Sequence, residues 1–234
     1  MFEVEMPVRY SEVDFREKLN IYGVINMFQD SSTLQSATVG NGVLALHEKN
    51  LVWVMSKWHV VVKRYPKYNE KLTVGTYPYK RNGFFCNRNY YMKDESGEMI
   101  AMADSLWILL NYKENTPARV TDEIVNVYPF GEKLPIDMPK TKILIPEGLT
   151  TQCELKVTNR YLDSNMHVNN AKYVEMALDA IGTEDFGTVR VEYRKQAHAG
   201  DILKINSCDV DNKKIVVIED SEKETVAVME FIND

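Results

Sequence analysis

The sequence predicts an α+β fold built from two copies of one unit, each a helix followed by a sheet. Two observations carry this prediction: an apolar stripe at helical spacing occurs twice, and four strand-like runs follow each stripe. A third is a proline-rich stretch between the two copies. With 234 residues, of which 44% are hydrophobic, the chain is long enough to bury a sizeable core.

The first unit, residues 1–115, opens with a short strand-like piece and continues as a helix. Its apolar stripe consists of Val24, Met27, Phe28 and Leu34. Runs rich in β-branched and aromatic residues follow at roughly 52–65, 70–79, 83–93 and 98–112. One helix leaves much of such a sheet uncovered, so we expect the two units to bury it jointly, with a crevice between them as a natural ligand site.

A linker is predicted over residues 116–150. Five of the eight prolines fall there: Pro117, Pro129, Pro135, Pro139 and Pro146. The stretch has neither a helical nor a strand period. We therefore expect it to run over the surface.

The second unit, residues 151–234, repeats the pattern of the first. Its helical stripe consists of Ala171, Val174, Leu178 and Ile181. Strand-like runs follow at roughly 187–197, 201–210, 213–220 and 224–232.

Local sequences also align, which indicates a tandem duplication. Three pairs of segments carry the alignment: Asn20–Tyr22 with Asn165–His167, Lys63-Arg64 with Arg194-Lys195, and Asp94–Glu98 with Asp220–Glu224. In this alignment Tyr22 stands where the second unit has His167, so we expect one reactive site in the chain.

Bulk properties exclude several classes of protein. The net charge of −6 gives no overall attraction to nucleic acid. No apolar run approaches the ~18 residues of a membrane span, and no secretory signal opens the chain. Three cysteines without close spacing predict reduced thiols in the cytoplasm, and only four histidines make a metal site unexpected.

The most specific segment is Asp163-Ser-Asn165-Met-His167-Val-Asn169-Asn170, where a loop enters the second helix. An imidazole titrates near neutrality and can take a proton from water. Nearby carboxylate and amide groups can orient it. The helix N-terminus offers free N–H groups to a carbonyl oxygen. Helix capping remains an alternative role for the two asparagines that follow His167.

This segment resembles the Asp-x-Asn-x-His-Val-Asn-Asn segment of the acyl-acyl carrier protein thioesterases of plants and bacteria. Four further segments resemble that family in the same order: Asn50-Leu-Val-Trp53-Val, Val60-Val-Val with Arg64-Tyr65-Pro66, Asp104-Ser-Leu-Trp107-Ile-Leu, and Val191-Glu-Tyr193-Arg-Lys195. The resemblance implies two tandem hotdog units, each an antiparallel sheet wrapped around a long helix. It also implies hydrolysis of fatty acyl-acyl carrier protein to free fatty acid, with no cofactor.

One departure from the family affects the expected mechanism. The family has a glutamate, and often a cysteine, where this chain has Gln196 and Ala197. A nucleophilic cysteine is excluded at Ala197, and an amide cannot act as a general base. We therefore expect His167 to be the base, assisted by Asp163 and Asn165, with Gln196 orienting the water. His198 is the alternative base.

The resemblance also implies where the substrate binds. It places the acyl chain in the first unit, against Val24, Met27, Phe28 and Leu34, and we add Asn169 as a substrate-binding residue. Acyl carrier protein is acidic, so docking needs basic residues. The candidates are Lys63, Arg64, Lys67, Lys71, Arg194 and Lys195. Whether the protein is a monomer with an internal pseudo-dimer or a homodimer stays open.

Three alternatives remain. An acyl-coenzyme A thioesterase would share the chemistry and differ in the carrier. A hotdog hydratase would need Asp-x-Asn-Pro-x-His, which this chain lacks. A non-catalytic acyl-binding protein would result if Gln196 abolished turnover.

Overall fold

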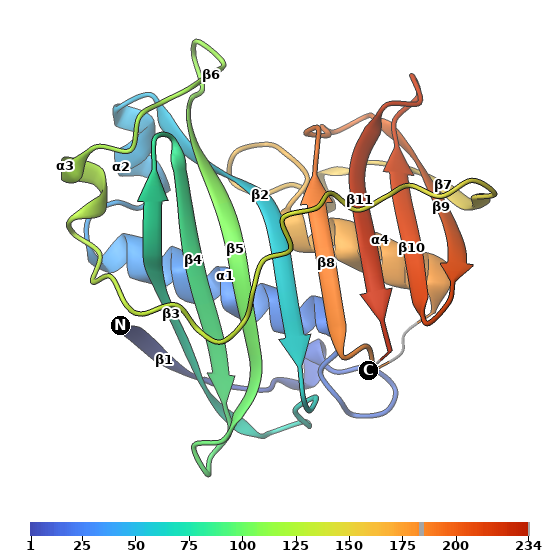
Figure 1. Ribbon diagram of the computed structural model, residues 1–234, viewed down its shortest axis with the longest axis horizontal. Helices are drawn as coiled ribbons and strands as arrows, with labels where there is room; N and C mark the ends of the chain where they lie inside the picture. Colours follow the sequence, from blue (N-terminus) through green and yellow to red (C-terminus); the bar gives the residue numbers. More distant parts are fainter. Residues whose placement is uncertain (183–184, 234) are drawn as a thin grey trace.

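The computed structural model describes residues 1–182 and 185–233. They form one curved antiparallel sheet of eleven strands, in the order β1-β3-β4-β5-β2-β8-β11-β10-β9-β7, with β6 paired to β5. Figure 1 shows both long helices, α1 and α4, behind this sheet, while the chain between β6 and β7 crosses in front of it. The predicted α+β class is confirmed.

The first half contains five long strands and two helices. Its elements are β1 (Phe2–Pro7), α1 (Ile21–Thr38), α2 (Val43–Glu48), β2 (Leu51–Val62), β3 (Lys71–Asn82), β4 (Phe85–Lys93), β5 (Met99–Asn111) and the short β6 (Thr116–Pro117). The second half repeats this order, and its described residues include no counterpart of α2. Its elements are β7 (Thr150–Lys156), α4 (Asn170–Ile181), β8 (Thr188–Tyr193), β9 (Ile202–Val210), β10 (Lys213–Glu219) and β11 (Thr225–Ile232).

The stripe predicted on α1 is confirmed for Val24, Met27 and Phe28, which are buried in the main core. The prediction is wrong for Leu34, whose surface is 44% exposed. The buried side of α1 continues through Gln35 instead, because the helical repeat carries Leu34 away from the sheet. A polar residue therefore occupies a buried position near the end of α1.

The tandem duplication is visible in matching backbone turns. The N–H of Asp14 donates to the carbonyl of Lys18 (2.9 Å), and the N–H of Asp163 donates to the carbonyl of His167 (2.8 Å). The offset between the halves here is 149 positions (167 − 18). The counterpart of His167 is therefore Lys18, and the prediction that Tyr22 occupies its place is wrong.

The misalignment arose from matching the wrong asparagines. Asn20 is the N-cap of α1, where its side chain accepts from the N–H of Gly23. Asn169 caps α4 in the same way, accepting from the N–H of Ala171. Asn20 therefore corresponds to Asn169, not to Asn165, because both asparagines satisfy the free N–H groups of a helix start.

Beyond the helices the offset falls to 131 positions, as predicted (194 − 63). The backbone N–H groups of Lys63 and Arg64 both donate to the carbonyl of Ile100. Those of Arg194 and Lys195 both donate to the carbonyl of Val226. The first half therefore has 18 more residues between its helix cap and this point (149 − 131). They lengthen α1 and add α2.

The two halves share one sheet and one core. β2 pairs with β8 in antiparallel register from Lys57↔Glu192 to Val61↔Thr188. Phe28 and Trp58 of the first half belong to the same buried cluster as Phe231 of the second. The halves are thus fixed relative to each other by backbone hydrogen bonds as well as by side-chain packing.

The segment between β6 and β7 is attached to the outer face of the sheet (Figure 1). Its short helix α3 (Asp122–Val125) packs with Leu109 in a small cluster, and Ile143 packs with Val217 and Val228 in another. These contacts cover sheet surface that the two long helices leave open. None of the described helices is long and apolar enough to cross a membrane.

A buried ion pair joins the halves and this segment. The Glu192 carboxylate accepts from Lys57 Nζ (2.9 Å), from Arg194 Nη2 (3.2 Å) and from the N–H of Ile143 (3.3 Å). Burial raises the pKa of Glu192, but the hydrogen bond and charge of Lys57 outweigh burial and hold it below the usual 4.5.

We predict that Glu192→Gln lowers the free energy of unfolding by about 2 kcal/mol at neutral pH, because Lys57 loses its buried counter-charge. A depressed pKa stabilises the fold above 4.5, and this stabilisation is lost as pH falls through the folded-state pKa. Urea denaturation should therefore show the difference from wild type shrinking in acid. Glu154→Gln, at an exposed position on β7, is the control. Equal effects of the two variants would contradict the prediction.

Candidate active site

A pocket of about 390 Å³ lies where the second half meets the first. Its walls come from α1, α2, the start of β2, a few residues of β3 to β5, the end of α3 with Tyr128 after it, and the loop before α4. The 18 extra residues of the first half supply much of the wall. Because the second half lacks α2, this arrangement has no repeat counterpart.

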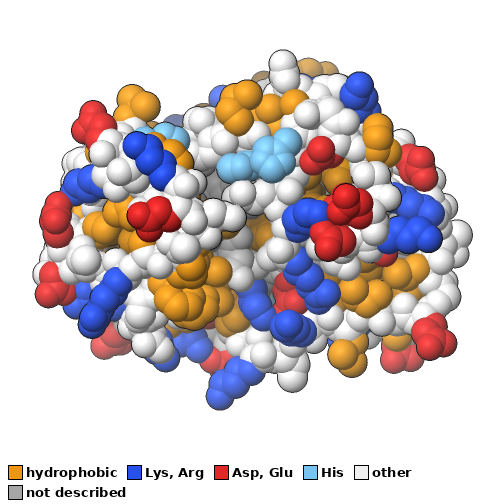
Figure 2. Space-filling model, turned by 90° about the horizontal axis from the view of Figure 1, so that it is seen from above, with side chains coloured by type: hydrophobic (Ala, Val, Ile, Leu, Met, Phe, Trp, Pro, Cys, Tyr) orange, Lys and Arg blue, Asp and Glu red, His pale blue; other side chains and the backbone are white. Residues whose placement is uncertain are grey.

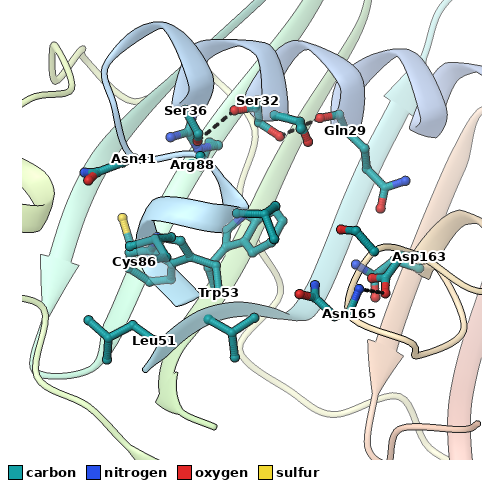
Figure 3. A pocket seen from close by; sticks show the side chains of 18 of the residues that line it. Gln29, Ser32, Ser36, Asn41, Leu51, Trp53, Cys86, Arg88, Asp163 and Asn165 are labelled. Atoms are coloured by element: carbon teal, nitrogen blue, oxygen red, sulfur yellow. Dashed lines mark hydrogen bonds between the residues drawn. The ribbon is translucent and has the colours of Figure 1, made fainter. Parts of the chain in front are cut away.

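The side of α1 that faces the pocket is polar. Gln29, Ser32 and Ser36 line it, and Figure 3 shows them in a row along the helix. The Ser32 hydroxyl donates to the carbonyl of Gln29 and the Ser36 hydroxyl to that of Ser32, both at 2.9 Å. The Ser36 oxygen already accepts from the Tyr128 hydroxyl (3.0 Å), and each hydroxyl oxygen offers two lone pairs, so both serines can still present an acceptor on the pocket wall.

The opposite wall is largely apolar. Leu46 of α2, Trp53 of β2 and Trp107 of β5 line it. Apolar walls with a few convergent polar groups are typical of small-molecule sites. The pocket therefore suits a ligand that is partly apolar and partly polar.

Asp163 holds the motif loop in shape. Its Oδ1 accepts from the N–H of Asn165 (2.8 Å) and from that of His167 (3.3 Å). The turn places Met166 at a positive φ of 64°. Asp163 and Asn165 both line the pocket (Figure 3). The carboxylate thus orients backbone, and in the described part of the chain it makes no hydrogen bond to the His167 ring.

The side chain of Asn165 contacts His47, which lies outside the sequence motif. His47 Nε2 lies 3.0 Å from Asn165 Oδ1, and the His47 ring lies 5.0 Å from the ring of Tyr112. His47 comes from α2 and lines the pocket. No sequence signal could have found it, because 118 positions separate it from Asn165.

The His167 ring lies outside the pocket wall that the described residues form. It packs edge-on against the His198 ring, with centroids 4.8 Å apart. Burial lowers the pKa of His167 below its usual 6.5, the nearby His198 lowers it further, and Asp163 acts in the opposite direction. A lowered pKa keeps this imidazole neutral, the form a general base requires. Figure 2 shows histidine side chains at the surface on the face that is seen from above.

Gln196 is exposed, in the loop after β8, and does not line the pocket. Its neighbour Ala197 is buried and its N–H donates to the Tyr173 hydroxyl (3.1 Å). The loop also carries His198, so Gln196 lies two positions from the ring that contacts His167. The structure thus brings Asp163 and Asn165 into the pocket but leaves His167 and Gln196 beside it.

Asn169 connects the two long helices. Its Oδ1 caps α4 and also accepts from Gln29 Nε2 of α1 (3.2 Å). Both residues line the pocket. The N-terminus of α4, with its free N–H groups, therefore lies at the pocket wall.

The predicted acyl-binding residues of α1 lie elsewhere. Val24 and Phe28 are fully buried in the core and line neither the pocket at the motif nor the hollow beside β1. Met27 and Leu34 line this hollow, which is the more open of the two. The pocket at the motif is lined by the polar side of the same helix instead.

Among the described pocket-lining residues, only Cys86 carries a thiol. Burial raises the pKa of this thiol to about 11, so it stays protonated at neutral pH. Within the described residues, one group has the spacing to hold a metal: Asp220, Glu222 and Glu224, in a hairpin turn. Lys195 pairs with two of these carboxylates.

Comparisons with known proteins agree with this architecture. Residues 1–128 match the family model of the acyl-ACP thioesterase N-terminal domain, and residues 147–229 match that of the C-terminal domain. A chloroplastic acyl-acyl carrier protein hydrolase of Cuphea viscosissima is 26% identical over 87% of this chain and 54% of its own length. An oleoyl-acyl carrier protein thioesterase of Arabidopsis thaliana is 25% identical over 84% and 59%. The chain thus spans somewhat over half the length of these relatives.

Solved structures share the fold. An acyl-ACP thioesterase of Bacteroides thetaiotaomicron superposes with a TM-score of 0.89 over 98% of this chain and 96% of its own, at 24% identity. A 12:0-ACP thioesterase of Umbellularia californica gives 0.85 over 99% and 96%, at 21% identity. The expected tandem hotdog architecture is confirmed.

We predict that the hydrogen bond between His47 and Asn165 couples the halves energetically. A double-mutant cycle of His47→Ala and Asn165→Ala, read as free energies of unfolding, should give a coupling of about 0.5–1 kcal/mol. The control cycle pairs Asn165→Ala with His59→Ala, because the His59 ring bonds instead to the carbonyl of Asp137. Additive effects in the first cycle would show that the bond contributes nothing.

Proposed function

Since this chain belongs to the acyl-acyl carrier protein thioesterase family, we propose that it hydrolyses fatty acyl-acyl carrier protein to a free fatty acid and the carrier. One observation supports this most: a single pocket joins the Asp163–Asn165 loop of the second half to apolar walls of the first. Such a pocket can hold an acyl chain in one half while its thioester lies at the loop of the other.

In the proposed reaction a neutral His167 takes a proton from water as the water attacks the thioester carbonyl. Its lowered pKa supports this role, because the neutral ring predominates at working pH. The free N–H groups at the start of α4 stabilise the developing oxyanion. Collapse of the tetrahedral intermediate then breaks the C–S bond, and the protonated His167 returns its proton to the leaving sulfur, which releases the carrier thiol and the fatty acid.

We propose that the neighbouring side chains orient these groups. Asp163 fixes the loop through its two backbone N–H partners. Asn165, held by His47, presents its amide at the pocket wall. Asn169 binds substrate beside the cap of α4. Gln196 orients the water through its amide, which can both donate and accept a hydrogen bond. Since His167 lies beside the pocket, the proposal requires the thioester to sit at the pocket mouth.

Acyl carrier protein is the proposed carrier because the relatives of this chain are named for it. The predicted basic residues give little support. Arg64 pairs with Glu70 and Asp94, and Lys195 pairs with Asp220 and Glu224. We further propose the cytoplasm as the compartment, since all three cysteines are free thiols.

We predict that His167→Ala lowers the rate of acyl-acyl carrier protein hydrolysis by at least ~10²-fold while substrate binding persists, because the base is lost. Release of free thiol measures the rate. In wild type the acid limb of kcat/KM should lie below pH 6.5, since a base with a lowered pKa stays neutral to lower pH.

The histidine partner offers the matched variant. His198→Ala removes the neighbouring imidazole whose electrostatic effect lowers the pKa of His167, so the acid limb should move to higher pH. Near-normal turnover in His167→Ala would assign the base to another group. So would an acid limb of kcat/KM that lies at the same pH in His198→Ala as in wild type. His198→Ala and His47→Ala rates would then show which imidazole acts.

The choice of carrier is tested with one acyl group attached to either carrier protein or coenzyme A. We expect kcat/KM to be at least ~10-fold higher with the carrier protein, and the advantage to shrink with added salt if charge steers docking. Equal values would identify an acyl-coenzyme A thioesterase. Binding of either substrate without thiol release would identify an acyl-binding protein.

A further inference from the structure

The pocket contains a buried cation that the proposed reaction does not use. Arg88 of β4 lines the pocket, yet only 8% of its surface is exposed. Figure 3 shows Arg88 with Ser36 and Asn41 at one end of the pocket, and Asp163 and Asn165 at the other. The charge thus lies far from the motif loop, toward the end of the pocket inside the first half.

The partners of Arg88 are all neutral. Its Nη1 donates to Gln35 Oε1 and to Thr76 Oγ1 (3.1 Å). The guanidinium carbon lies 5.2 Å from the centre of the Tyr128 ring. Across residues 1–182 and 185–233, no carboxylate lies within 4.0 Å of the guanidinium, although Asp30 and Asp163 line the same pocket. Arg88 is therefore a buried charge without a counter-ion.

A buried charge is costly unless it is paired. Guanidinium has five N–H donors in a planar fork that matches a carboxylate, and in the described chain the hydrogen bonds of Arg88 all come from Nη1. Gln35 and Thr76 fix one edge of the fork. The remaining donors are available to an anion in the pocket.

The surroundings of Arg88 are built and rigid. Gln35 is 1% exposed and comes from the buried side of α1. Tyr128, from the segment after α3, covers the guanidinium and its hydroxyl donates to Ser36 Oγ (3.0 Å). Asn41 Nδ2 donates to the carbonyl of Ile124 (2.8 Å), which ties the same segment to the pocket. Side chains locked in this way preorganise a binding group.

The wall between the two ends is apolar. Trp53, Trp107 and Leu46 line it. A ligand that fits both ends therefore has a carbonyl at the motif loop, a hydrocarbon middle and an anionic group at Arg88. A simple alkyl chain would put a methyl group against an unpaired cation.

We propose that the pocket selects acyl chains that carry a carboxylate at the end remote from the thioester, and that Arg88 binds this carboxylate. The proposal rests on the proposed thioester hydrolysis and names its substrate class. Arg88 acts on specificity, since it contacts the far end of the substrate and not the reacting atoms.

The test compares two acyl-carrier protein substrates of equal chain length, one ending in a methyl group and one in a carboxylate. Wild type should favour the carboxylate substrate in kcat/KM by roughly tenfold or more, as expected for a charge-assisted hydrogen bond. Arg88→Met should abolish or invert this ratio, and Arg88→Lys should retain part of it. Because the readout is a ratio, partial loss of folded protein does not affect it.

Arg81→Met is the matched control. Arg81 lies on β3, pairs with Asp122 and does not line the pocket, so the ratio should keep its wild-type value. A wild-type preference for the methyl-ended chain, or a ratio unchanged in Arg88→Met, would overturn the proposal.

Binding separates this proposal from the proposed function. The probes are S-(2-oxoalkyl)-pantetheine thioethers, which keep a carbonyl but cannot be hydrolysed, with and without the terminal carboxylate. Tighter binding of the carboxylate probe to wild type, lost in Arg88→Met, supports the proposal even if no thioester is turned over. A carboxylate could also come from a free fatty acid. If plain fatty acids bind through Arg88 as tightly as the carboxylate probe, the site binds product and the substrate proposal fails.

Discussion

The pairing of β2 with β8 is the constraint on which the rest of the molecule depends. It joins the strands of the two halves into one sheet that encloses one core. It also fixes α1 beside α4, so that Gln29 meets Asn169 and α2 meets the motif loop. Without this register, Asn165 would have no His47 and the pocket would have no second wall. A shift of β2 against β8 by one residue would turn every side chain of the strand to the other face of the sheet. The register therefore holds the two halves of the site in a fixed relative position.

An unequal duplication then creates the pocket. Both halves keep the same turn before the helix, the same cap and the same hairpin, because these satisfy local backbone groups. The first half differs by 18 residues that lengthen α1 and add α2. These residues place a polar helix side and an apolar wall around the pocket. The second half thus supplies the sequence motif, and the first half supplies most of the pocket wall.

The pocket combines chemical groups that a packed core would exclude. Ser32, Gln29 and Arg88 lie on or near its wall, opposite tryptophans. Arg88 in particular has neutral partners where a structural ion pair would have a carboxylate, as Glu192 has Lys57 at the seam. Charged groups that are buried and incompletely paired are expected at functional sites, where a ligand completes them. Buried polar groups with incomplete hydrogen bonding thus lie where substrate is proposed to bind.

The sequence by itself determined the α+β class, the repeated units, the strand regions and the Asp163–Asn170 motif, because periodicity, turns and caps are local. It placed the repeat equivalence wrongly at the motif, since two asparagines of different function look alike until their backbone partners are known. It also placed Leu34 wrongly, because small and polar residues along α1 hid which side faces the sheet. Only the tertiary structure decided that His47 meets Asn165, that the His167 ring lies beside the pocket, and that Arg88 has no carboxylate partner among the described residues. Those features depend on contacts between segments that are distant in the sequence. Such contacts produce no periodic pattern in the sequence from which they could be predicted.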